Sequence, residues 1–75
     1  MAAVTRNALG PLCATRGWSD VDLALRSGLD RAHVNQVKNG RAIPTIATAL
    51  ALARALEVPV ATAFPPGSAV RRGQR

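Results

Sequence analysis

The sequence is poor in the residues that build catalytic or metal sites. Its 75 residues include one cysteine, Cys13, one histidine, His33, and four acidic side chains. A single cysteine excludes an internal disulfide and a cysteine-based zinc site. One histidine without clustered acids provides too few groups for a metal site or a nucleophile–base pair. No glycine-rich phosphate loop is present either, so the sequence predicts a protein that is not an enzyme and needs no metal or cofactor.

Aromatic residues and long hydrophobic runs are also scarce. Trp18 and Phe64 are the only aromatic residues, and fifteen residues are alanine, a composition that favours helices over strands. The most apolar stretch, residues 46–56, is too short to cross a bilayer and contains Arg54. The first ten residues contain no apolar segment long enough for a signal peptide. We therefore expect one small all-α domain in the cytoplasm, associated with the nucleoid if it binds DNA, and no membrane partner.

Acidic residues are too few to balance the basic ones. Ten lysine and arginine residues face four aspartate and glutamate residues, which gives a net charge of +6. Three of the acids, Asp20, Asp22 and Asp30, stand where helices are expected to begin, and there they serve backbone N–H groups. The cations are therefore largely uncompensated. This pattern is typical of a protein that binds a polyanion, or of one that is merely kept soluble by its charge.

Breakers and caps divide the first half of the chain into three short helices. The first is expected over residues 7–16, with Gly17 after it. Ser19 and Asp22 have the spacing of a capping box and open the second helix, which Gly28 ends in a left-handed conformation. Asp30 caps the third helix, expected over residues 31–38.

A fourth helix follows Pro44-Thr45 and ends before Val58-Pro59. Helical spacing predicts the residues of its core-facing side: Ile46, Ala49, Leu50, Ala53 and Leu56. A last short turn is expected over residues 60–64. From residue 65 the sequence is PPGSAVRRGQR, a composition typical of a disordered basic tail. We therefore predict a compact bundle of four to five helices, residues 1–64, and a tail, residues 65–75.

The second and third helices, joined by the sequence SGLD, form a helix-turn-helix signature. On a helical wheel of the third helix, Val34 and Val37 point inward and Ala32, Asn35 and Gln36 point outward. Amides suit adenine, arginine suits guanine, and an alanine methyl can lie on the thymine methyl. An ordinary solvated helix face instead alternates glutamate and lysine. Because residues 31–40 contain no acid, the pattern favours base reading.

Residues 18–64 resemble the helix-turn-helix domain of phage repressors and Cro proteins, the XRE family. The resemblance rests on WSDVDLA, SGLDRAHVNQVKNG, RAIPT, IATALALARALEV and PVATAF, where the glycines, the Leu-Ala pair and the proline have the family's spacing. It implies a transcriptional regulator that binds double-stranded DNA through a third helix in the major groove. The base readers it implies are Arg31, Ala32, Asn35 and Gln36. The phosphate-binding residues are Ser19, Asn39 and Arg41, with Lys38 beside them.

The sequence departs from this family's pattern at Gly10-Pro11, which would sit inside the family's first helix, and at four further positions. Asp20 stands where many relatives carry glutamine next to the DNA backbone, and an acid there repels phosphate unless a cation or the helix N-terminus neutralises it. Lys38 replaces a frequent glutamate, Cys13 a common arginine, and Leu25 a residue that is usually polar. Ser19 also has a second interpretation, in which it only caps its helix.

The leading interpretation is a repressor that acts as a homodimer. One recognition helix covers few base pairs, so two half-sites supply useful specificity. Apolar residues in excess of one small core are expected at the dimer interface, and the candidates are Leu52, Val60 and Phe64.

The sequence also allows functions other than a homodimeric repressor. The chain could be an antitoxin that neutralises a partner toxin and represses its own operon, in which case the tail would bind the partner. A peripheral membrane protein would need a more basic amphipathic helix than this chain offers.

Trp18 is expected in the core, with base stacking as an alternative. The arginines of the tail, Arg71, Arg72 and Arg75, could follow a DNA backbone or stay in solvent.

Overall fold

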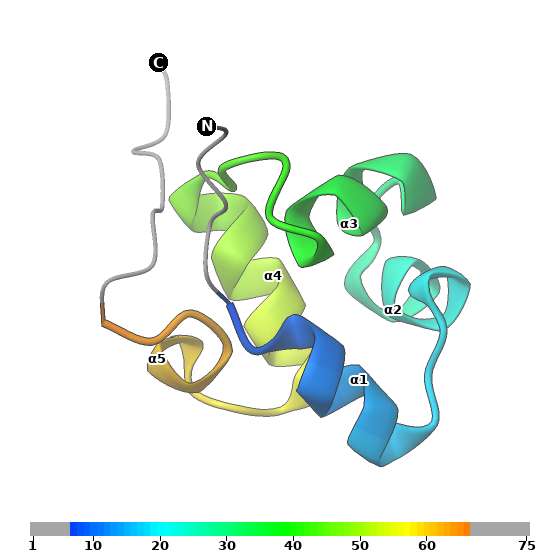
Figure 1. Cartoon of the computed structure of the whole chain (residues 1–75), viewed down its shortest axis with the longest axis horizontal. Coiled ribbons are helices and arrows are strands. Elements are labelled where there is room, and N and C mark those ends of the chain that lie inside the picture. Colours follow the sequence, from blue (N-terminus) through cyan, green and yellow to red (C-terminus); the bar gives the residue numbers. More distant parts are fainter. Residues whose placement is uncertain (1–6, 67–75) are drawn as a thin grey trace.

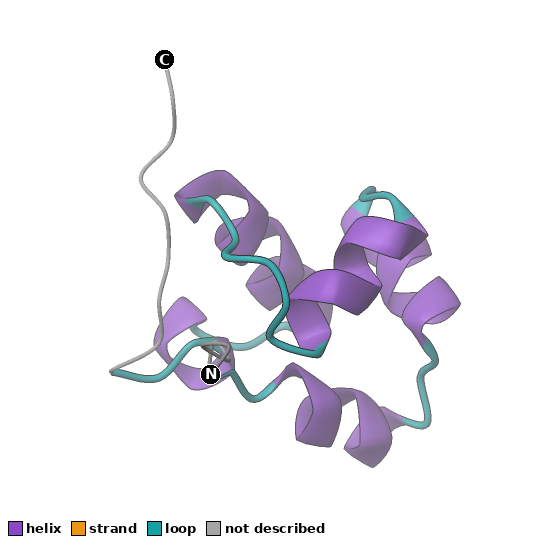
Figure 2. Ribbon diagram, turned by 45° about the horizontal axis from the view of Figure 1, so that its top comes forward, coloured by secondary structure: helices purple, strands orange, loops and turns teal. Residues whose placement is uncertain are grey.

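Five helices make up the part of the chain that the computed structural model describes, residues 7–66 (Figure 1). They are α1 Leu9–Arg16, α2 Asp20–Ser27, α3 Arg31–Lys38, α4 Ile46–Leu56 and α5 Val60–Ala63. Short loops join them, and no strand is present among these residues (Figure 2). The predicted all-α fold with a helix-turn-helix is therefore confirmed. Most of the expected basic tail, residues 67–75, lies outside the described residues.

Helix α1 begins two residues later than the spacing predicts. The Asn7 side chain accepts a hydrogen bond from the Leu9 N–H over 3.0 Å and so takes part in starting the helix. Pro11 falls in the first turn, where its missing N–H leaves no hydrogen bond unmade. The helix ends at Gly17, whose φ of 71° lies in the left-handed region that favours glycine.

The caps of α2 and α3 are those expected from the sequence. The Ser19 hydroxyl accepts from the Asp22 N–H over 3.3 Å, and the Asp22 carboxylate accepts from the Ser19 N–H over 2.9 Å. This capping box satisfies two of the N–H groups that a helix start leaves free. Asp30 caps α3 by accepting from the N–H groups of Ala32 and His33.

Helix α4 crosses the middle of the molecule, with α2 and α3 on one side and α5 on the other (Figure 1). All five helices contribute to one core, whose larger members are Leu9, Leu23, Val34, Val37, Leu52, Leu56 and Phe64. Burial of each such side chain contributes about 1.5–3 kcal/mol. Cys13 belongs to the same core, where burial raises the pKa of its thiol.

The buried side of α4 differs from the predicted one. Ala49, Ala53 and Leu56 are buried as expected, but Ile46 is 48% exposed and Leu50 is 41% exposed. Leu52, which we expected at a dimer interface, is completely buried. This expectation was wrong, because a side chain enclosed by its own core presents no surface to a second copy.

Trp18 is half-buried and packs against the core, as expected. The Arg26 guanidinium lies 4.4 Å from the centre of its ring, and that of Arg16 lies 5.8 Å away. These are distances at which cations are attracted to an indole ring. Arg16 also donates to the Leu56 carbonyl over 2.7 Å, so it connects the ends of α1 and α4.

Candidate DNA-binding surface

The core fixes the position of α3 against α2. Leu23 and Ala24 of α2 are buried, as are Val34 and Val37 of α3. Between the helices, Gly28 has a φ of 76°, so the chain turns where a side chain would be strained. Because the two valines hold one side of α3 in the core, its opposite side must face outward.

The four predicted base readers gather on this outward side. Arg31, Ala32 and Gln36 are exposed and Asn35 is half-buried. They surround a polar hollow of about 360 Å³, which Arg41 closes from the loop after α3. The structure therefore brings together the residues that the sequence proposes for base reading and one residue that it proposes for phosphate binding.

The loop after α3 folds back onto the helix and places Arg41 there. The Arg41 N–H donates to the Gln36 carbonyl over 2.8 Å. Gly40, with a φ of 77°, allows this turn. Asn39 and Arg41 are both exposed at the C-terminal end of α3, so their side chains are free to meet an anion.

Asp20 joins the two helices at the same surface. Its carboxylate accepts a hydrogen bond from Asn35 Nδ2 over 2.6 Å and forms an ion pair with Lys38 Nζ at 2.5 Å. The hydrogen bonds from Asn35 and Lys38 lower the pKa of Asp20, and they outweigh its burial. Lys38 therefore neutralises the charge of the Asp20 carboxylate within the protein.

Sequence reasoning did not find this contact. Fifteen residues separate Asp20 from Asn35, and no local spacing rule joins them. A hint was available, because Asp20 and Lys38 are both departures from the pattern of the XRE family. Two departures of opposite charge on neighbouring helices indicate an ion pair between those helices.

The other predicted phosphate contacts have different surroundings. Ser19 is exposed, and its hydroxyl is engaged in the capping box, so its capping role is confirmed and its contact with phosphate stays a prediction. The Lys38 side chain is 25% exposed and would have to reach a phosphate while held by Asp20.

Among residues 7–66, no group of three or more His, Cys, Asp and Glu side chains could hold a metal ion. No helix in that range is long and apolar enough to cross a membrane.

The chain matches one protein-family model and is similar to a solved structure. Residues 13–62 match the family model described as helix-turn-helix, and this range contains all eight candidate DNA-binding residues. The chain is also similar to the crystal structure of the restriction-modification controller protein C.AhdI from Aeromonas hydrophila. The TM-score is 0.67 and the sequence identity 36%, over 69% of this chain and 79% of that one. No curated protein matches the chain.

Proposed function

Because the chain belongs to the helix-turn-helix family and is thus a DNA-binding transcriptional regulator, we propose that it is a repressor that binds its operator as a homodimer, with α3 in the major groove. The outward side of α3 carries this proposal. It presents amides, an arginine and a small residue around one hollow, and residues 31–40 contain no acid that would repel phosphate.

Base reading is assigned to Arg31, Ala32, Asn35 and Gln36. Arg31 can donate two hydrogen bonds to guanine, Gln36 can pair with adenine through both ends of its amide, and the Ala32 methyl can contact a thymine methyl. Each good bidentate pair discriminates against a wrong base by about 1–3 kcal/mol.

Phosphate binding is assigned first to Asn39 and Arg41, which are exposed beside the reading surface. Ser19 can contribute at the start of α2, beyond its capping role. Lys38 can contribute through the ammonium hydrogens that Asp20 does not engage. Such contacts fix the register of the protein on the duplex and add affinity that depends on salt but not on sequence.

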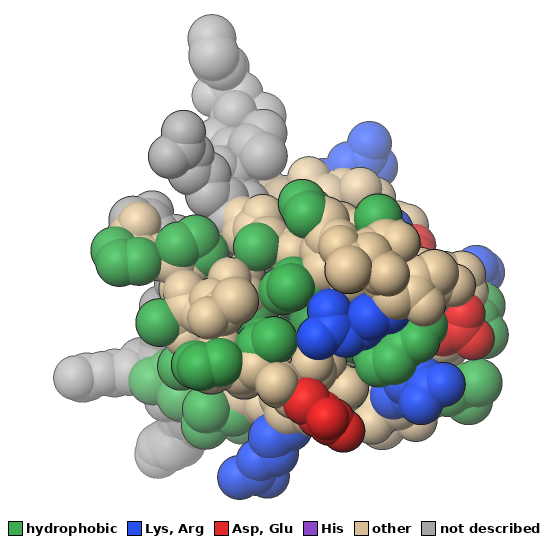
Figure 3. Space-filling model, turned by 90° about the horizontal axis from the view of Figure 1, so that it is seen from below, with side chains coloured by type: hydrophobic (Ala, Val, Ile, Leu, Met, Phe, Trp, Pro, Cys, Tyr) green, Lys and Arg blue, Asp and Glu red, His purple; other side chains and the backbone are tan. Residues whose placement is uncertain are grey.

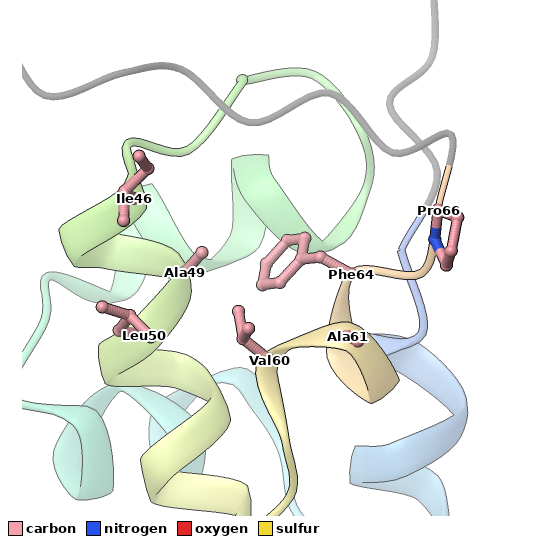
Figure 4. A pocket seen from close by; sticks show the side chains of 7 residues that line it. All are labelled: Ile46, Ala49, Leu50, Val60, Ala61, Phe64 and Pro66. Atoms are coloured by element: carbon pink, nitrogen blue, oxygen red, sulfur yellow. The ribbon is translucent and has the colours of Figure 1, made fainter.

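An apolar groove between α4 and α5 supports the homodimer. The groove has a volume of about 370 Å³, with Ile46, Ala49 and Leu50 on one wall and Val60, Ala61, Phe64 and Pro66 on the other (Figure 4). Val60 is 38% exposed and Phe64 is 6% exposed. Of the original interface candidates, Val60 thus offers surface and Phe64 forms part of the floor, while Ile46 and Leu50 replace Leu52.

The position of the groove suits a symmetric dimer. It lies on the α5 side of the molecule, so a second copy seated there would leave α3 uncovered (Figure 1). Hydrophobic side chains gather on this same side in the space-filling view (Figure 3). A twofold dimer uses the same patch on both copies, and helix-turn-helix dimers in general bind half-sites one helical turn apart, roughly 34–36 Å.

Repression is the simplest regulatory mode for such a dimer. Occupation of a site that overlaps a promoter blocks the polymerase, and it needs no surface beyond the DNA-binding side and the dimer groove. The similarity to a restriction-modification controller protein supports a role in controlling the expression of other genes.

Selection of duplex DNA from a random pool by the purified protein tests the proposal. We expect enrichment of an inverted repeat with half-sites about one helical turn apart, and repression of a promoter that carries this site. Enrichment of a single asymmetric half-site would contradict the homodimer. A pool that stays random would contradict sequence-specific binding altogether.

A further inference from the structure

The Asp20 carboxylate holds two side chains of α3 that lie three residues apart on the same side. Its Oδ2 accepts from Asn35 Nδ2 over 2.6 Å, and its Oδ1 lies 2.5 Å from Lys38 Nζ. The Asp20 side chain is only 17% exposed, and its buried Oδ1 is compensated by the Lys38 ammonium. Asp20 is therefore held at the edge of the reading surface and is not free to turn toward solvent.

A carboxylate accepts hydrogen bonds and cannot donate them when ionised. At 2.6 Å from Asp20, the amide of Asn35 must therefore turn its NH₂ group toward the carboxylate, because its carbonyl oxygen would be repelled there. Elsewhere an asparagine amide can present either end. The low pKa of Asp20 keeps the carboxylate ionised at neutral pH, so this orientation is maintained.

We propose that Asp20 is a positioning residue for sequence recognition, which fixes the Asn35 amide so that its carbonyl oxygen Oδ1 meets the base. This inference rests on the proposed function. Asn35 borders the hollow that the other base readers line, and its Oδ1 takes no hydrogen bond from another residue in the range 7–66. The oxygen is thus available to a partner that enters the hollow.

The orientation has a consequence for the base that Asn35 can accept. An oxygen acceptor pairs with an exocyclic amino group, which adenine and cytosine present in the major groove. Guanine and thymine present the acceptors O6 and O4 at the corresponding edge and would be repelled. We therefore expect a preference for adenine or cytosine at the position that Asn35 contacts, of about fivefold or more.

The test compares Asp20→Asn with Asp22→Asn in the full chain. Both substitutions remove one negative charge from the first turn of α2 and raise the net charge equally, but only Asp20 touches Asn35 and Lys38. Random-pool selection is repeated with each variant and with Asn35→Ala, and the base preferences are compared position by position.

The expected result is that Asp20→Asn and Asn35→Ala reduce the preference at the same position, from about fivefold or more to less than twofold. Asp22→Asn should keep the wild-type preferences. The double variant Asp20→Asn/Asn35→Ala should lose no more than either single variant, as residues that act through one contact do. Preferences in Asp20→Asn that match those of the wild type, or that change only at other positions, would overturn the role of Asp20.

A measurement without DNA separates this inference from the proposed function. In the NMR spectrum of the free protein, the side-chain NH₂ signals of Asn35 should be shifted and slow to exchange, and Asp20→Ala, which leaves no oxygen to accept from Asn35 Nδ2, should abolish both effects. Asn35 signals with ordinary shifts and fast exchange would overturn the positioning role even if the protein binds DNA. If the wild-type protein enriches no sequence, the proposed function fails, and with it the reading role of Asn35, whatever the NMR signals show.

Discussion

Asp20 and Lys38 form an ion pair between the first turn of α2 and the last residue of α3, with Oδ1 and Nζ 2.5 Å apart. The pair joins the two helices of the helix-turn-helix unit at a surface to which α3 itself contributes no acid. It has two effects: it compensates the charge of a largely covered carboxylate, and it fixes the C-terminal end of α3 against α2.

Replacement of Lys38 by methionine should destabilise the fold. Asp20 would keep its hydrogen bond from Asn35 but lose the cation beside its buried oxygen, and an uncompensated polar group of this kind costs about 1–3 kcal/mol. Urea denaturation followed by circular dichroism measures the change. The double variant Asp20→Asn/Lys38→Met should recover most of the lost stability, and a double variant as unstable as Lys38→Met would contradict the ion pair.

The free energy of unfolding should depend on pH through Asp20. Its pKa is lowered in the folded state by the hydrogen bonds from Asn35 and Lys38, while an unfolded aspartate titrates near its usual value of about 3.9. The stabilisation is therefore complete above about pH 4–5 and is lost as the pH falls through the lower pKa of the folded state. Urea midpoints between pH 6 and pH 2 should fall more steeply for the wild type than for Asp20→Asn. Parallel curves would show that Asp20 is not the group responsible.

The two leucines of α4 should respond differently to the same substitution. Leu52→Ala removes a completely buried side chain and should cost about 2–5 kcal/mol of stability. Leu50→Ala removes a side chain that is 41% exposed in the apolar groove, so it should cost less than about 1 kcal/mol and weaken self-association. Light scattering over a concentration series measures the latter. A Leu50→Ala protein that dimerises as strongly as the wild type would place the interface elsewhere.

Glycine at position 57 should stabilise the protein. Glu57 ends α4 with a φ of 58°, and it is the only non-glycine residue with a positive φ in the described range. The left-handed conformation costs a non-glycine residue about 1–2 kcal/mol. The greater conformational freedom of glycine in the unfolded chain reduces the gain in stability from removing this cost by about 0.4–1 kcal/mol. Thermal unfolding should show Glu57→Gly to be more stable by about 0.5–1 kcal/mol. Glu57→Ala, which keeps the strain, is the matched control and should show no such gain.

Much of the fold could be predicted from local chemistry. Ser19 and Asp22 form a capping box, Asp30 caps α3, and Gly17 and Gly28 adopt the left-handed conformation, all as their sequence positions indicate. Each of these features depends on hydrogen bonds or dihedral angles within a few residues, so the sequence alone contains the necessary information.

The orientation of α4 could not be predicted in the same way. Of its eleven residues, only Thr48 and Arg54 are not apolar, so hydrophobic spacing does not single out one buried side. The packing of α2 on one side and α5 on the other turns Leu52 inward and leaves Ile46 and Leu50 in the groove. The contact of Asp20 with Asn35 escaped prediction for the related reason that it depends on how two helices pack.

The most direct test of base reading by α3 compares Gln36→Ala with Arg41→Ala. Affinities for the selected site and for a scrambled duplex are measured over a range of salt concentrations. Gln36→Ala should lower the ratio of specific to non-specific affinity by about 5- to 150-fold and leave the salt dependence unchanged. Arg41→Ala should weaken both duplexes alike and reduce the salt slope by about 0.9. If both variants lower the specific and non-specific affinities to the same extent, α3 does not read the bases and the account is wrong.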